Sequence, residues 1–109
     1  MADNERQMKR MSVTIANTDG TKRIATVWDL GQAGQTYVDV YGNTITLDPG
    51  SLAAAAHREG AKTVHNYIDW LAANDWNVSR KTFPSRYWAP AAQRLQDAQG
   101  LPYQPLYVR

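Results

Sequence analysis

Apolar and polar side chains alternate between Met11 and Leu47, with the period of two that is typical of half-buried β-strands. Two turn signals, Asp19-Gly20 and Gly42-Asn43, interrupt the alternation. Pairs of this kind occupy the central positions of tight hairpin turns, where the backbone needs a positive φ. The pattern therefore predicts two β-hairpins, one centred on each pair.

The register of each predicted hairpin follows from its turn, because a two-residue turn fixes which residues face each other. In the first hairpin Ile15 lies opposite Ile24, and Trp28 continues the same apolar face. The segment Gly31–Gln35 is then a loop that leads to the second hairpin. Joined in this way, the two hairpins form a four-stranded antiparallel β-meander.

The second hairpin places Val38 opposite Leu47 on the apolar face, which leaves Tyr37 and Tyr41 on the solvent-facing side. Arg23 of the first hairpin belongs to that side as well. An open sheet face with aromatic and basic groups is one candidate docking surface, although it lacks the aromatic motif of RNA-recognition sheets.

A helix is predicted directly after the last strand. Asp48 can accept hydrogen bonds from the first free amides of a helix, and Pro49 fits the first helical position. The Ala-rich stretch that follows favours helix up to Gly60, which breaks or bends it.

Two further helices are predicted over about Ala61–Asp75 and Pro90–Ala98. In the first of them Val64, Ile68 and Leu71 form an apolar stripe at spacings of three and four residues. Such a stripe can cover the apolar side of the sheet. The predicted fold is therefore α+β, a four-stranded antiparallel β-meander with two to three C-terminal helices packed on one face.

Length and composition limit the classes of protein. The chain has 109 residues, of which 43% are hydrophobic, and this suits one domain. We expect residues 1–9 to be a flexible N-terminal segment and residues 10–109 to be a single α+β domain. The absence of cysteine excludes disulfides and thiolate chemistry, and no apolar run is long enough to span a bilayer. A cytoplasmic location without membrane association is expected.

Charge and aromatic side chains are concentrated toward the carboxyl end. The segment Trp76–Arg109 holds six of the eleven aromatic residues and a formal charge of +4, whereas Met1–Asp75 sums to −2. Within it, residues 76–88 combine basic and aromatic side chains and contain no acid. This composition indicates a surface for an anionic or partly apolar macromolecular partner.

The candidate partner-binding residues come from this segment and from the preceding helix, where a tryptophan is predicted at the boundary with water. They are Trp70, Trp76, Arg80, Lys81, Arg86, Tyr87 and Trp88. Trp, Tyr and Arg are favoured at interface hot spots, and aromatic rings can also stack on bases. A structural role competes with this interpretation, because aromatic side chains in a loop between helices often close the edge of a domain.

Catalytic and metal-binding interpretations have weaker support. His65 and Asp69 are four residues apart on one helix, so the carboxylate could orient the imidazole as in general-base catalysis. An ordinary surface pair explains this spacing equally well, and no serine has the context of a nucleophile. His57 and Glu59 could join His65 and Asp69 as metal ligands, but the spacing of these four residues matches no metal-binding motif. We therefore expect no catalytic residues, no metal and no cofactor.

These observations predict a non-enzymatic binding protein that docks on a larger protein or nucleoprotein complex. Small cysteine-free domains of this kind include phage or mobile-element inhibitors of host defence systems, a comparison that concerns size and class alone. The alternative is direct DNA or RNA binding through the basic-aromatic segment 76–88. A hydrolase or transferase that uses His65 and Asp69 is a third hypothesis. The sequence does not determine the oligomeric state.

Overall fold

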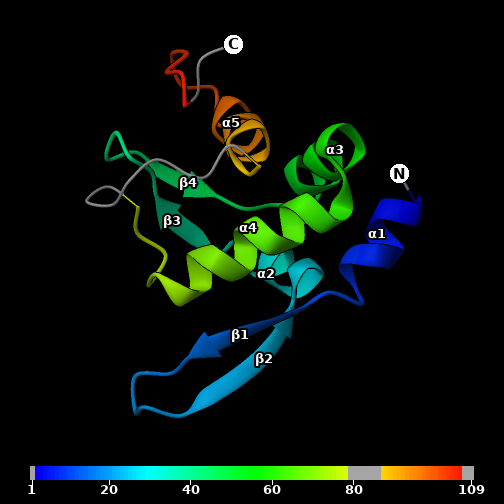
Figure 1. The fold of residues 1–109 in the computed structure, drawn as a ribbon, viewed down its shortest axis with the longest axis vertical. Coiled ribbons are helices and arrows are strands. Elements are labelled where there is room, and N and C mark those ends of the chain that lie inside the picture. The colour runs from blue at the N-terminus through cyan, green and yellow to red at the C-terminus, as the bar shows by residue number, and fades with distance from the viewer. Residues whose placement is uncertain (1, 79–86, 107–109) are drawn as a thin grey trace.

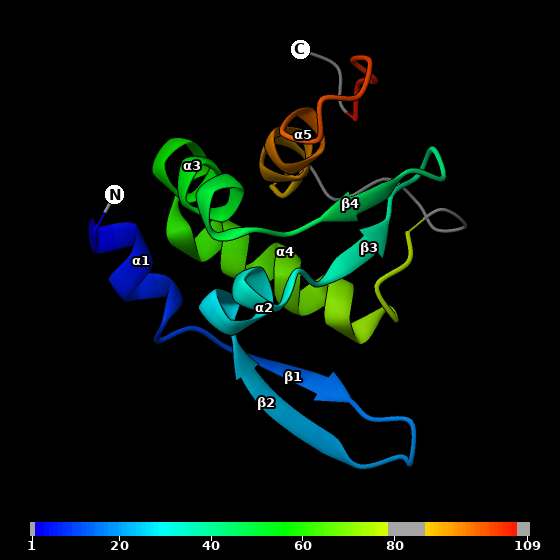
Figure 2. The ribbon, with the colours of Figure 1, turned by 180° about the vertical axis from the view of Figure 1, so that it is seen from behind.

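The computed structural model of the chain describes residues 2–78 and 87–106. The helices and strands within them are α1 (Ala2–Met8), β1 (Ser12–Ala16), β2 (Lys22–Thr26), α2 (Val27–Ala33), β3 (Thr36–Val38), β4 (Thr44–Thr46), α3 (Pro49–Glu59), α4 (Ala61–Ala73) and α5 (Ala89–Asp97). Helix α4 crosses the middle of the molecule (Figure 1). The β1–β2 hairpin lies on one side of it, and α3, α5 and the β3–β4 hairpin lie on the other (Figures 1 and 2).

Helix α4 forms the centre of the core. Its predicted stripe is confirmed, because Val64, Ile68 and Leu71 are buried, together with Tyr67 and Ala72 on the same side. These side chains pack against β1, α3 and α5. One amphipathic helix thus joins the β1–β2 hairpin to helices α3 and α5.

Helix α3 begins as the sequence predicts. The Asp48 carboxylate accepts hydrogen bonds from the backbone N–H and the hydroxyl of Ser51, at 2.8 and 2.7 Å. Pro49 occupies the first helical turn, and the chain leaves the helix at Gly60, whose φ of 93° lies outside the helical range. The carboxylate cap and the glycine break therefore fix both ends of α3.

The α+β class is confirmed, but the four-stranded meander is wrong. Within the described residues the strands form two separate antiparallel pairs, β1–β2 and β3–β4. The segment that the alternation assigned to the middle of the meander is partly helical. Helix α2 replaces it, and this helix separates the two hairpins (Figure 2).

The start of α2 is set by a capping box. The Thr26 hydroxyl accepts from the Asp29 backbone N–H at 3.0 Å, and the Asp29 carboxylate accepts from the Thr26 backbone N–H at 3.2 Å. Leu30 and Gly31 are buried in this helix, and Gly34 ends it with a φ of 69°. Trp28 therefore lies on α2 and does not continue a strand face, and residues 31–33 of the predicted loop are helical.

The first hairpin has a register different from the predicted one. Ile15 pairs with Arg23, and Val13 pairs with Ala25. The turn contains three residues, 18–20, and Gly20 closes it by donating its N–H to the Asn17 carbonyl at 3.2 Å. One extra residue in the turn moves the side chains of β2 to opposite faces, because side chains alternate along a strand. Ile24, predicted to be inside, is therefore 72% exposed.

The second hairpin also has a different register, with Val38 opposite Thr44 in place of the predicted Leu47. Tyr37 pairs with Ile45 and both are buried, so the prediction that Tyr37 faces solvent is wrong. Its turn also spans three residues, 40–42, and the Gly42 N–H donates to the Asp39 carbonyl at 3.0 Å. The Asp39 carboxylate accepts from the backbone N–H groups of Tyr41 and Asn43, at 2.9 and 2.8 Å, which fixes the turn from inside.

The first residues were predicted to be a flexible segment. In the structure residues 2–8 form helix α1, and the Met8 side chain is fully buried among core residues. Lys9 lies over the Trp28 ring, with its Nζ 5.1 Å from the ring centroid. Residues close to the N-terminus thus contribute to the core; the division of the chain into a segment and a domain stays a prediction.

Helix α5 matches the third predicted helix, with Ala91, Ala92 and Leu95 buried. Two glutamines on the same face are buried as well, and they hold the segment Leu101–Leu106, which we call the C-terminal tail. Gln93 Oε1 accepts from the Leu106 backbone N–H at 2.7 Å, and Gln96 Nε2 donates to the Gln104 carbonyl at 2.9 Å.

The opposite side of the C-terminal tail is held by the turn between β3 and β4. Asn43 Nδ2 donates to Gln104 Oε1 at 2.6 Å, and the Tyr41 hydroxyl donates to the Pro105 carbonyl. Among the apolar side chains of the tail, Leu106 is buried, while Leu101 and Tyr103 are exposed.

Candidate functional site

Helices α4 and α5 bring together a group of aromatic rings that are distant in the sequence. We call Tyr37, Tyr67, Trp70 and Trp88 the aromatic cluster. Trp70 stacks on Tyr67, with ring centroids 6.1 Å apart and an angle of 15° between the planes. Trp88 lies 5.6 Å from Trp70 and 6.4 Å from Tyr67. Such contacts add about 0.5–1.5 kcal/mol per pair to the burial of the rings.

The cluster extends from the core toward the surface. Tyr37 meets Tyr67 edge to face at 6.0 Å, and both side chains are buried. Trp70 and Trp88 are partly buried, and Tyr87, which precedes Trp88 in the sequence, is 86% exposed. The buried tyrosine rings therefore support a partly buried indole pair, and anchored aromatic side chains of this kind are typical of interface hot spots.

Neither buried tyrosine is suited to proton transfer at neutral pH. Burial raises the pKa of the Tyr37 hydroxyl well above its ordinary value of 10.0, and it raises the pKa of the Tyr67 hydroxyl in the same direction. Both hydroxyls therefore stay protonated. Their contribution is to the packing of the cluster.

Trp70 reaches the cluster because it lies one helical turn after Tyr67, on the same side of α4. Its predicted position at the boundary with water agrees with its partial burial, and Trp88 at the start of α5 covers part of it. Asn74 Nδ2 donates to the Trp70 carbonyl at 2.8 Å, which satisfies a carbonyl at the end of the helix.

Trp76 occupies a constrained backbone position. Asp75 and Trp76 have φ values of 56° and 58°, in the left-handed region that few non-glycine residues adopt. The Val38 backbone N–H donates to the Trp76 carbonyl at 2.9 Å, and the Val78 N–H donates to the Val38 carbonyl at 2.8 Å. The chain is thus fixed beside β3 just before the basic segment begins.

The candidate residues Arg80, Lys81 and Arg86 lie outside the described residues, so their contacts stay predictions. The structure describes the residues on either side of this segment. Val78 on one side is buried, and Trp88 on the other side belongs to the aromatic cluster.

The His65 side chain contacts the backbone of β1. Its Nε2 lies 2.8 Å from the Ser12 carbonyl of β1, so this nitrogen must carry the hydrogen. The imidazole therefore joins α4 to β1. Asp69 lines a cavity of ≈ 360 Å³, together with Lys22 and Asp75.

The sequence did not place Tyr37 and Tyr67 in one site with Trp70 and Trp88. Tyr37 was assigned to the solvent-facing side of the sheet because the predicted register was wrong. The spacing of Tyr67 and Trp70, three residues apart on one helix, indicates that these two rings are neighbours, but no sequence pattern joins them to Tyr37 or Trp88.

Comparisons with protein-family models, with curated proteins and with solved structures find no match to this chain. None of the helices in residues 2–78 and 87–106 is long and apolar enough to cross a membrane. Among the same residues, no three His, Cys, Asp or Glu side chains are grouped so that they could hold a metal ion.

Proposed function

We propose that this protein is a non-enzymatic binding protein that docks on a larger protein or nucleoprotein complex. We call Trp70, Trp76, Tyr87 and Trp88, with the basic side chains of Arg80, Lys81 and Arg86, the docking surface. The observation that carries the proposal is an indole pair supported by buried rings, with the exposed Tyr87 directly before Trp88 in the chain. Aromatic residues held in this way lose little conformational entropy when a partner covers them.

The basic residues supply the second part of the proposal. Three cations lie within a segment that contains no acid, and such a segment attracts a partner with an acidic surface and speeds its encounter. The aromatic residues then provide the apolar contact area. The two contributions predict that charge reversal slows association, whereas truncation of the rings speeds dissociation.

The test is affinity capture from the native host, with and without nuclease, using the wild-type chain and an Arg80→Glu, Lys81→Glu, Arg86→Glu variant. We expect the triple variant to lose its partner. A matched control, Lys22→Glu, Arg23→Glu, Lys62→Glu, makes the same charge change at exposed positions elsewhere and should retain the partner. A triple variant that captures every wild-type partner would contradict the proposal.

Direct binding to DNA or RNA is the second candidate, favoured by the exposure of Tyr87 directly after Arg86. A base stacked on this ring contributes about 1–3 kcal/mol in single-strand binders, and phosphate contacts make the affinity fall steeply with salt. A gel shift with a single-stranded oligonucleotide at about 50 mM salt tests this candidate. The Tyr87→Ala variant should bind more weakly, and the absence of any shift with the wild-type chain rules it out.

Inhibition of a host defence complex is the specific form of docking that we propose for a protein of this size. The proposal depends on class and size, and the captured partner decides it. Recovery of a host defence complex would support inhibition only if that complex lost activity when the protein was added in equimolar amount.

A further inference from the structure

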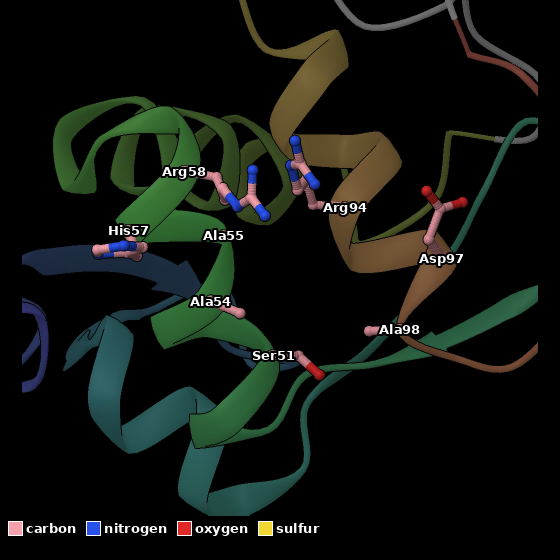
Figure 3. Close-up of a pocket in the computed structure, with 8 residues that line it drawn as sticks. All are labelled: Ser51, Ala54, Ala55, His57, Arg58, Arg94, Asp97 and Ala98. Carbon is pink, nitrogen blue, oxygen red and sulfur yellow. The ribbon is translucent and has the colours of Figure 1, made fainter. Parts of the chain in front are cut away.

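A cleft of ≈ 470 Å³ lies between α3 and α5, and none of the residues that line it belongs to the aromatic cluster. Its volume is in the range of small-molecule sites, roughly 300–1,000 Å³. Three alanines, Ala54, Ala55 and Ala98, give it apolar walls, and Ser51 lies at one end (Figure 3). Short side chains at these positions leave the space open.

Two arginines point into the other end of the cleft. Arg58 comes from the last turn of α3 and Arg94 from α5, and their guanidinium groups point toward each other (Figure 3). Glu59 accepts from Arg94 Nε at 3.1 Å. Among the residues that the structure describes, no acceptor takes the other donors of Arg94 or any donor of Arg58.

The other charged groups near the cleft leave these donors available. Asp97 lines the cleft, and its Oδ1 accepts from Gln93 Nε2 at 2.9 Å. Asp48 accepts from Ser51 at the helix start, and the His57 ring points away from α5 (Figure 3). Glu59 offsets part of the charge of Arg94 through a single nitrogen, so Arg58 and the outer edge of Arg94 form the cationic end.

We propose that this cleft binds a phosphomonoester of a small molecule, with the phosphate between Arg58 and Arg94 and the organic group against the alanine walls. Two guanidinium groups that converge repel each other, and an anion between them removes that cost. A phosphomonoester has three strong acceptor oxygens and carries about −1.5 to −2 charges at pH 7, so it can accept from Arg58 and from the remaining nitrogens of Arg94 at the same time, whereas a carboxylate has only two oxygens. Planar guanidinium groups also bind phosphate oxygens in pairs.

The experiment is a titration of the full chain, followed by backbone amide NMR at constant ionic strength, with phenyl phosphate, inorganic phosphate and benzoate as probes. We expect saturable shifts at Ala54, Ala55 and Ala98, with phenyl phosphate binding tightest. Equal affinity for inorganic phosphate would overturn the role of the apolar walls. Tighter binding of benzoate would overturn the choice of phosphate, and the absence of saturable shifts would overturn the site.

Variants separate the site from general charge effects. Arg58→Gln should weaken phenyl phosphate about ten-fold or more, since hydrogen bonds to charged groups are lost. Arg23→Gln removes the same charge from exposed strand β2 and should leave affinity unchanged. Ala54→Leu fills the cleft at an exposed position of a helix, retains the charge and should also abolish binding. Unchanged affinity in Arg58→Gln or Ala54→Leu would refute the proposal.

Discussion

At the scale of single residues, the backbone at the end of α4 has the least common geometry in the described chain. A non-glycine residue in the left-handed region costs about 1 kcal/mol, and Asp75 and Trp76 adopt it in succession. The hydrogen bond between the Trp76 carbonyl and Val38 holds them there. The position of Trp76 on the docking surface therefore depends on contacts with β3 as well as on its own side chain.

The expected result of this strain is an unusual tolerance of glycine. Asp75→Gly should leave the free energy of unfolding unchanged or raise it by up to about 0.5 kcal/mol, because relief of strain offsets the added entropy of the unfolded chain. Asp69→Gly, the same change inside α4, should lower it by about 0.3–0.5 kcal/mol, the difference between the helix propensities of aspartate and glycine. Urea denaturation of both variants measures the difference, and equal losses at the two positions would contradict the interpretation.

The carboxylate at the start of α3 gives a prediction that depends on pH. Hydrogen bonds from Ser51, first from its backbone N–H, lower the pKa of Asp48 from its ordinary value of 3.8. The stabilisation is therefore fully present above that value and is lost as pH falls through the lower, folded-state pKa. Asp48→Ala should cost about 1 kcal/mol at pH 7 and progressively less below pH 4.

Thermal unfolding from pH 7 down to pH 2 provides this measurement. Asp48→Asn is the control, because asparagine still caps a helix and does not titrate. A difference between wild type and Asp48→Ala that does not change across this range would show that the carboxylate charge contributes nothing to the cap.

At the scale of elements, the two hairpins show why register was difficult to predict. In both turns an Asn or Asp residue precedes a three-residue loop that ends in glycine, Asn17 before Gly20 and Asp39 before Gly42. Three-residue loops with a left-handed glycine at the end are a common alternative to two-residue turns. Side-chain hydrogen bonds hold both turns, between Thr21 and the side chains of Asn17 and Asp19 in the first and to the Asp39 carboxylate in the second, and the alternating pattern does not reveal them.

The observed register predicts a pair of opposite results on β2. Ile24→Lys should change the free energy of unfolding by less than about 1 kcal/mol, because Ile24 faces solvent. Ala25→Lys should cost more than about 2 kcal/mol, because it forces a charge into a buried position. Chemical denaturation of the two variants tests the register, and the reverse order of stability would restore the two-residue turn.

Several elements could be predicted from the sequence, and the reasons are local. Asp48 with Pro49 marks the start of α3, and the spacing of Val64, Ile68 and Leu71 marks α4. Helix α2 was missed because Val27 and Trp28 favour strands, although Thr26 and Asp29 carry the capping-box spacing. Tertiary contacts, which a single sequence does not contain, decide such ambiguous segments.

The candidate site was predicted in composition but not in geometry. The tryptophans at 70 and 88 were chosen for their residue type, and their mutual contact follows from the packing of α5 on α4. The cleft with Arg58 and Arg94 was not predicted at all, since these residues lie on different helices and match no motif. Only the fold brings them together.

At the scale of the whole molecule, the C-terminal tail is part of the fold. Leu106 is buried in the same core as Met8, and buried glutamines hold the backbone that carries it. Leu106→Ala should therefore lower the free energy of unfolding by about 2–3 kcal/mol, through lost burial and a residual cavity. Tyr103→Ala should lower it by less than Leu106→Ala does, because 55% of Tyr103 is already exposed in the folded protein.

Denaturation curves of the two variants, fitted with the same dependence of the unfolding free energy on denaturant concentration, measure this difference. Loss of stability confined to Tyr103→Ala would mean that the tail is held from its exposed side. Little effect of either change would mean that the core is complete without the tail.

The burial of Leu106 has a consequence for the order of folding. Gln93 and Gln96 bind the backbone of the C-terminal tail, so helix α5 completes its buried contacts only when the tail has docked. A folding intermediate in which the tail is still undocked exposes this part of the core, and exposed apolar surface of this kind favours aggregation.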